Sequence, residues 1–250
     1  LSHPDTSVTK KEARGIRHVA AKRAQGTPIA YIVGERSFYG RTFQVTKHTL
    51  IPRPETETLV DIAKGLHAPN TGYIDIGTGS GAISVTLAAE TGAPVIATDV
   101  SRKALKIAKT NARRQGVGDL IRFAKGDLLG ALSPRWFRDW NRVVLTANLP
   151  YLTEEMYSKA PDQAFTNELG FEPKGALVSD ATDGLDDYRR LFTQIQEGRN
   201  AFPADLIVLI ELLPLQKRPA EKAIRLIASQ AKIIGHKDLS KRYRVLEVHL

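Results

Sequence analysis

Two stretches of this sequence carry residues whose types and spacing could do chemistry. The first follows an apolar run and reads D-x-G-x-G-x-G, beginning at Asp75. Glycine accepts positive φ and lets a ligand approach bare backbone, and a helix predicted to follow the loop presents unpaired N–H groups at its N-terminus. We therefore expect a small polar ligand on this loop. Its residues are Gly77, Thr78, Gly79, Ser80 and Gly81.

The second stretch, Asn148-Leu149-Pro150-Tyr151, follows a strand predicted over residues 142–147. An amide or aromatic amine is a poor nucleophile because its lone pair is delocalised. The side-chain carbonyl of Asn148 and the backbone carbonyl of Leu149 can accept its two N–H groups and aim the lone pair at an electrophile. Pro150 would stiffen the loop, and the ring of Tyr151 would pack on a planar substrate. Such catalysis rests on positioning and electrostatics.

A further acid completes the first stretch. A second strand, predicted over residues 94–98, ends in Asp99, where a carboxylate can accept hydrogen bonds from two ribose hydroxyls. The glycine spacing differs from the G-x-G-x-x-G of dinucleotide binders. Strand, glycine loop, helix, strand and acid together resemble the cofactor half of the S-adenosylmethionine-dependent methyltransferases with a doubly wound sheet. The resemblance implies S-adenosylmethionine as cofactor and S-adenosylhomocysteine as product.

The same resemblance assigns roles to individual residues. It implies cofactor binding by Asp75, by the loop residues 77–81 and by Asp99. Asp127, after the third predicted strand, could accept a hydrogen bond from the adenine amino group, and Leu128 could cover the ring. Asn148 would border both cofactor and substrate, because its tetrapeptide resembles the signature of methyltransferases that act on planar nitrogens.

The order of strands and helices follows from hydrophobic periodicity. The predicted fold class is α/β, with a doubly wound, mostly parallel seven-stranded sheet of the class I, Rossmann-like methyltransferase type, preceded by an N-terminal helix and a β-hairpin around Gly40. Strands are predicted over residues 73–76, 94–98, 120–124, 142–147, 206–211, 231–235 and 244–249. Helices are predicted over residues 9–25, 54–66, 80–90, 103–116, 185–199 and 216–229, and residues 1–8 are predicted to be disordered. The first helix, being amphipathic, must pack on something.

Three further segments resemble one methyltransferase family. They are G-x-P-x-x-Y-I-x-G over residues 26–34, the proline-rich segment over residues 50–57, and Asp183-Gly184-Leu185 with Tyr188-Arg189-Arg190. Together with the two loops they resemble the glutamine-N5 protein methyltransferases, which modify the Gly-Gly-Gln motif of translation release factors or a glutamine of a ribosomal protein. The resemblance implies a protein substrate of one of these kinds. It also implies that Arg53, Glu55 and Thr56 line the site.

Domain boundaries follow from the same comparison. We expect a tail and remnant helix over residues 1–28, a β-hairpin linker over residues 29–53 and a methyltransferase domain over residues 54–250. The family normally begins with a helical bundle of several tens of residues, of which only the last helix is expected here.

Several departures leave alternatives open. The glutamine family has a proline where this chain has Leu149, and Asn-Leu-Pro-Tyr resembles the ribosomal-RNA adenine-N6 dimethyltransferases more closely. A glycine-rich turn is replaced by residues 179–182, and the usual Glu-Ile-Gly reads Glu211-Leu212-Leu213. An adenine-N6 methyltransferase on RNA or DNA is therefore the alternative, although it leaves the segment over residues 26–57 unexplained. A catalytically silent module is a third hypothesis, which the intact loops disfavour.

Composition limits the remaining classes. The chain has 250 residues, 42% hydrophobic residues, no cysteine and a net charge of +9. The absence of cysteine excludes disulfides and thiolate chemistry, and no apolar run reaches the ~20 residues of a membrane span. Six histidines show no ligand spacing with carboxylates, so no metal is expected. We expect a cytoplasmic monomer, and the basic charge leaves direct nucleic-acid binding open.

Overall fold

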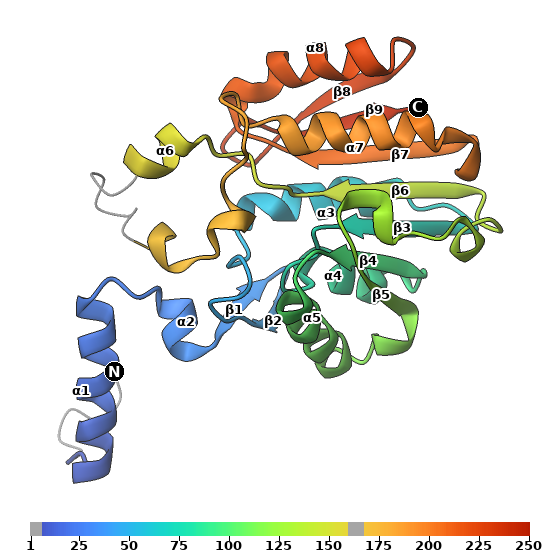
Figure 1. The fold of residues 1–250 in the computed structure, drawn as a ribbon. Coiled ribbons are helices and arrows are strands. Elements are labelled where there is room, and N and C mark those ends of the chain that lie inside the picture. The colour runs from blue at the N-terminus through green and yellow to red at the C-terminus, as the bar shows by residue number, and fades with distance from the viewer. Residues whose placement is uncertain (1–6, 160–167) are drawn as a thin grey trace.

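Seven strands form one mixed sheet in the computed structural model, which describes residues 7–159 and 168–250 (Figure 1). Their order is β5-β4-β3-β6-β7-β9-β8, in which β3 to β7 are parallel and β9 is antiparallel to both of its neighbours. The strands are β3 (Thr71–Ile76), β4 (Val95–Asp99), β5 (Ile121–Lys125), β6 (Arg142–Ala147), β7 (Asp205–Glu211), β8 (Lys232–Lys237) and β9 (Tyr243–His249). The predicted doubly wound sheet is confirmed. The disorder predicted for residues 1–8 falls largely outside the described residues.

The central strands are buried on both faces. All six residues of β3, the last five of β6 and the last six of β7 are buried. A parallel strand covered on both sides needs a continuous apolar run rather than alternation, which is how these segments read in the sequence. Because β4 and β6 pair with opposite edges of β3, the carboxyl ends of these strands border a crevice at the point where the strand order reverses.

Helices cover both faces of the sheet (Figure 1). The first layer is α3 (Glu57–Gly65), α4 (Ala82–Thr91) and α5 (Arg102–Arg114), and the second is α7 (Asp186–Glu197) and α8 (Lys217–Ile227). Successive strand residues point to opposite faces. Tyr73 therefore packs in one core cluster with Leu59 and Leu87, whereas Ile74 packs in the other with Leu191 and Ile224.

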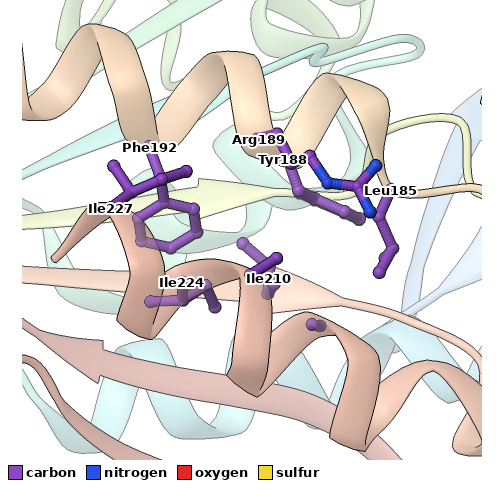
Figure 2. Close-up of a pocket in the computed structure, with 9 residues that line it drawn as sticks. Leu185, Tyr188, Arg189, Phe192, Ile210, Ile224 and Ile227 are labelled. Carbon is purple, nitrogen blue, oxygen red and sulfur yellow. The ribbon is translucent and has the colours of Figure 1, made fainter. Parts of the chain in front are cut away.

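The second layer is closely packed. Figure 2 shows Phe192 of α7 and Ile224 and Ile227 of α8 gathered around Ile210 of β7. The cavity left between these helices is about 10 Å³, roughly the room of a single water molecule. This hollow is core packing and offers no space for a substrate.

The N-terminal part consists of α1 (Lys10–Ala24), α2 (Ile29–Val33) and a hairpin of β1 (Glu35–Phe38) and β2 (Arg41–Gln44). The hairpin predicted around Gly40 is confirmed, and its buried Phe38 and Phe43 rings meet edge to face at 6.0 Å. The short helix α2 was not predicted. It ends at Gly34, whose φ of 85° stops the helix after five residues.

Helix α1 forms where predicted, but the expectation that it packs on another element is wrong for the described residues. None of its residues is buried, and it stands apart from the sheet (Figure 1). Local interactions hold it instead: a capping box joins Thr9 to Glu12, and Arg23 pairs with Glu168 at 2.6 Å. Its only large apolar side chains, Ile16 and Val19, are too few to form a broad apolar face.

Two other segments complete the chain. The helix predicted over residues 54–66 begins as a 3-10 turn, Pro54–Thr56, before α3. Between β6 and α7 lie α6 (Glu154–Lys159) and the short turns Leu169–Phe171 and Lys174–Ala176, and residues 160–167 lie outside the described residues. The domain boundaries at residues 28 and 53 stay predictions.

The third glycine of the loop offers a test of packing. A Cβ at Gly81, whose φ is 81°, would lie 3.1 Å from Ala108 Cβ, whereas a Cβ at Gly92, whose φ is 67°, would meet nothing within 4 Å. We expect Gly92→Ala to lower the free energy of unfolding by about 1–2 kcal/mol through backbone strain alone. Gly81→Ala should lose about 1–3 kcal/mol more from overpacking. Urea unfolding measures both, and equal losses would contradict the packing argument.

Candidate active site

A cavity of about 420 Å³ lies at the carboxyl ends of β3, β4, β5 and β6. Its volume is in the range of small-molecule sites. The structure brings eight of the predicted site residues to its wall: Gly77, Gly79, Asp99, Asp127, Leu128, Asn148, Leu149 and Pro150. The other eight lie behind or beside the wall: Arg53, Glu55, Thr56, Asp75, Thr78, Ser80, Gly81 and Tyr151.

The glycine loop and Asp99 are joined through backbone hydrogen bonds. Gly77 and Gly79 have φ of 72° and 56°, so residues with a Cβ would be strained at both positions. The N–H of Gly79 donates to Asp99 Oδ2 at 2.9 Å, and the N–H of Ser101 donates to Oδ1 at 2.8 Å. Burial raises the pKa of Asp99, and these two N–H groups oppose that rise. The carboxylate is thus fixed at the wall with lone pairs left for a diol.

Asp75 lies beneath the loop rather than in the cavity. It is fully buried, and its Oδ1 accepts a hydrogen bond of 2.8 Å from the Thr146 hydroxyl. Burial raises its pKa to about 6, and hydrogen bonds from Thr78, Thr146 and Ser84 limit the rise. Among the described residues, Oδ2 has no hydrogen bond of good geometry. Asp75 therefore braces the loop from below.

The other loop residues also act as supports. The hydroxyls of Thr78 and Ser84 lie 2.6 Å apart, and the carbonyl of Ser80 accepts a hydrogen bond of 2.8 Å from the buried Asn111 side chain. Gly81 begins α4 and packs closely on Ala108 of α5. These contacts hold the loop in one shape before any ligand arrives.

Asp127 and Leu128 form the far wall of the cavity. Leu128 is buried and adopts a φ of 46°, a strained conformation for a residue with a side chain, and such strain gathers at ligand sites. Asp127 Oδ2 is paired with Arg190, whose other nitrogen lies 2.9 Å from Asp187 Oδ1. Oδ1 of Asp127 remains for a ligand.

The asparagine loop lies beside the glycine loop. Its side-chain nitrogen, Asn148 Nδ2, donates to the Thr56 hydroxyl at 3.3 Å. A Cβ at Gly77 would lie 3.1 Å from Leu149 Cδ2, so the leucine side chain faces the glycine loop. The hydroxyl of Tyr151, a residue that does not line the cavity, donates to Glu211 Oε1 at 3.3 Å.

The proline-rich segment contributes indirectly. Arg53 forms an ion pair with Glu172, a buried residue that also accepts the N–H of Ile51 at 2.9 Å. This pair ties the segment to the turn that follows, where Pro173, Gly175 and Ala176 cover the cavity. Thr56 contacts the asparagine loop, and Glu55 is exposed.

Several residues that line the cavity were not predicted from the sequence. The missed side includes His48, Val100, Ser101, Ala104, Asp187 and the covering turn at residues 173–176. Val100 and Ser101 follow the predicted Asp99, so their place could have been found. Ala104 lies on the helix that follows Asp99, whereas His48, Asp187 and the turn at residues 173–176 come from segments far apart in the sequence.

The residues present fit S-adenosylmethionine. The cavity joins a bare glycine backbone, a fixed carboxylate at the end of β4 and an apolar cover at Leu128, which suit the amino-acid, ribose and adenine parts of that molecule in turn. Within the described ranges, no group of three or more histidine, aspartate or glutamate side chains could hold a metal. No described helix is long and apolar enough to cross a bilayer.

Comparison with known proteins places the chain. Residues 67–201 match the family model described as a methyltransferase domain. A release factor glutamine methyltransferase of Nitratidesulfovibrio vulgaris is 40% identical over 178 residues, covering 70% of this chain and 57% of that protein. Another, of Rhodopirellula baltica, is 33% identical over 249 residues, covering 96% of this chain and 80% of that protein.

Solved structures share the fold. The catalytic domain of human Mettl16 in complex with a MAT2A 3′UTR hairpin superimposes with a TM-score of 0.65 at 15% identity, covering 94% of this chain and 90% of that chain. The N-terminal domain of human METTL16, in complex with SAH, gives a TM-score of 0.56 at 16% identity, with coverage of 96% and 95%. At such identities the likeness concerns the fold alone.

Fold and site together define a class I, S-adenosylmethionine-dependent methyltransferase, as predicted. The chain belongs to the family of the release factor glutamine methyltransferases. It spans 57% of the length of the first relative and 80% of the second.

Asp99 offers a test of the cofactor site. Asp99→Asn replaces one acceptor oxygen by a donor, so either Gly79 N–H or a ribose hydroxyl loses its partner. Because hydrogen bonds to charged groups are worth about 1.5–3 kcal/mol, we expect S-adenosylhomocysteine to bind about tenfold to a hundredfold more weakly. Isothermal titration calorimetry measures this. Asp119→Asn, in an exposed turn, is the control, and equal affinities of the two variants would refute the assignment of Asp99.

Proposed function

We propose that the protein transfers a methyl group from S-adenosylmethionine to the side-chain N5 of a glutamine, in the Gly-Gly-Gln motif of a peptide chain release factor. One observation carries this proposal: Asn148, Leu149 and Pro150 line the same cavity as the glycine loop and Asp99. The names of the relatives support the substrate. An amide acceptor presented at Asn148 would face the cofactor site directly.

The chemistry assigned to the chain is positioning. Bound S-adenosylmethionine supplies an electrophilic methyl group on a positively charged sulfur. The carbonyl oxygens of the Asn148 side chain and the Leu149 backbone would each accept one N–H of the glutamine amide. These bonds hold the amide plane in one orientation and increase electron density on its nitrogen. Pro150 limits the motion of the loop, and Tyr151 anchors its end to β7 through Glu211.

The place of Leu149 does not distinguish a glutamine from an adenine substrate. With leucine at this position, the tetrapeptide resembles that of the adenine-N6 enzymes, and this resemblance is the basis of the alternative substrate, RNA or DNA. Its side chain, however, is 5% exposed, belongs to the core cluster and faces Gly77 of the cofactor loop. The part of Leu149 assigned to the substrate is its backbone carbonyl, which any residue supplies. The exchange of proline for leucine therefore does not argue for a nucleic-acid substrate.

A transfer assay tests the substrate. Labelled S-adenosylmethionine is incubated with a purified release factor, with its Gly-Gly-Gln variant in which glutamine is replaced by alanine, and with ribosomal RNA. We expect label on the wild-type factor alone, because the other two lack a glutamine amide at the required position. Label on RNA alone would refute the glutamine proposal and support the adenine-N6 alternative.

Asn148 tests the mechanism. Asn148→Ala removes the acceptor proposed for the substrate amide, so we expect kcat to fall on the order of a hundredfold to a thousandfold, as when a comparable polar group is removed elsewhere. Asn141→Ala, at an exposed position before β6, is the matched control and should retain wild-type kcat. A similar kcat for both variants would remove Asn148 from the mechanism.

A further inference from the structure

Helix α7 holds the loop that follows β5 at two points. Arg190 forms an ion pair with Asp127 Oδ2, and Gln194 Oε1 accepts the N–H of Leu129 at 3.0 Å. Because Arg190 and Gln194 are four residues apart on one helix, their side chains lie on the same face of α7. The residues immediately before and after Leu128 are therefore both fixed to this helix.

Leu128 is the residue of this loop that most needs such support. Its φ of 46° costs free energy for a residue with a Cβ and persists only where the surrounding structure imposes it. The side chain of Leu128 is 5% exposed and lines the cofactor cavity. The contacts of Asp127 and Leu129 with α7 hold the strained backbone that places Leu128 there.

The helix is a rigid support for these contacts. Its residues Leu191 and Ile195 are buried in the core cluster against the sheet, and a side chain on a packed helix is held more precisely than one on a loop. Arg190 also donates to Asp187 Oδ1 at 2.9 Å, so one guanidinium holds two carboxylates of the cavity wall. With Oδ2 of Asp127 bound to Arg190, its Oδ1 is left to accept a hydrogen bond from a ligand.

The order of the strands brings the base of the cofactor to this loop. The sheet runs β5-β4-β3, with the glycine loop after β3, Asp99 at the end of β4 and Asp127 after β5. A ligand whose amino-acid part lies on the glycine loop and whose ribose lies on Asp99 extends its base toward Asp127 and Leu128. The 6-amino group of adenine only donates hydrogen bonds, and an ionised carboxylate only accepts them.

We propose that Arg190 and Gln194 are positioning residues that determine the base specificity of the cofactor site. They hold the Asp127 carboxylate as the acceptor of the 6-amino group and Leu128 as the apolar cover of the adenine ring. A purine with a 6-oxo group would place a second acceptor against that carboxylate. The inference concerns the cofactor and not the methyl acceptor, so it does not depend on the proposed glutamine substrate.

Calorimetry with two ligands tests the specificity. The ligands are S-adenosylhomocysteine and S-inosylhomocysteine, which has a carbonyl oxygen in place of the 6-amino group. We expect the wild type to bind the adenine ligand at least about tenfold more tightly, because the other ligand loses a hydrogen bond to a charged group. In Arg190→Gln and in Gln194→Leu the affinity for S-adenosylhomocysteine should fall about tenfold, and the preference should narrow to about threefold or less. A variant that merely lost stability would leave the ratio of the two affinities unchanged.

Arg189→Gln is the matched control for this experiment. Arg189 directly precedes Arg190 and pairs with Asp183, and the two arginine side chains are similarly exposed, at 39% and 43%. Arg189 lines the small hollow between α7 and α8 in Figure 2 and not the cofactor cavity. Its variant should keep the wild-type affinity and preference. The proposal is overturned if the wild type shows no preference, if either test variant keeps the wild-type preference, or if Arg189→Gln narrows it as much as Arg190→Gln.

Hydrogen exchange tests the contact at Leu129 without any ligand. The amide of Ile74, in the buried strand β3, reports opening of the whole sheet and serves as the reference. Relative to it, the Leu129 amide should exchange at least about tenfold faster in Gln194→Leu, which offers no acceptor. In Gln194→Glu an acceptor oxygen remains, so the relative rate should stay near that of the wild type. An unchanged relative rate in Gln194→Leu would overturn the role of Gln194.

Discussion

The site depends on the parallel pairing of β3 with β6. Its register sets Asp75 beside Thr146 and Ile76 beside Ala147, so the two strands end at the same level of the sheet. The Thr146 hydroxyl joins Asp75 across this pair, although the two residues are 71 positions apart in the chain. The glycine loop and the asparagine loop therefore leave the sheet side by side. A register shift of one residue would turn Asp75 to the opposite face, and the two loops would no longer share one cavity.

The sheet and half of the site residues could be predicted because local sequence patterns indicate them. Buried parallel strands read as apolar runs, and Gly77 and Gly79 mark a loop whose backbone adopts positive φ. Asp99 ends β4 and Asn148 directly follows β6, so topology alone brings them to one crevice. The prediction of the cofactor rested on these residues, and that of the family also on the segments over residues 26–34, 50–57 and 183–190. The comparisons confirm both.

The rest depends on tertiary packing that no local pattern encodes. The packing of the Tyr151 ring on the substrate stays a prediction, whereas the contact of its hydroxyl with the buried Glu211 at the end of β7 could not be read from the tetrapeptide. Thr56 was predicted to line the site, but the sequence did not indicate its contact with the Asn148 side chain. Helix α1 was expected to pack on another element because it is amphipathic. In the structure none of its residues is buried. The contacts of Tyr151 and Thr56 join residues far apart in the sequence, which no local pattern encodes.

The net charge of the chain and the charges on the cavity wall are opposite in sign. The chain has a net charge of +9, which by itself suggests an anionic partner. The cavity has the opposite character, since Asp99, Asp127 and Asp187 all lie on its wall. Of these, Asp127 and Asp187 share Arg190, whereas Asp99 meets only backbone N–H groups and keeps its charge uncompensated by a cation. At such short range a fixed carboxylate outweighs surface lysines, whose fields are screened by salt within about 10 Å. The net charge of the chain therefore does not describe the cavity, whose own carboxylates bear on the chemistry.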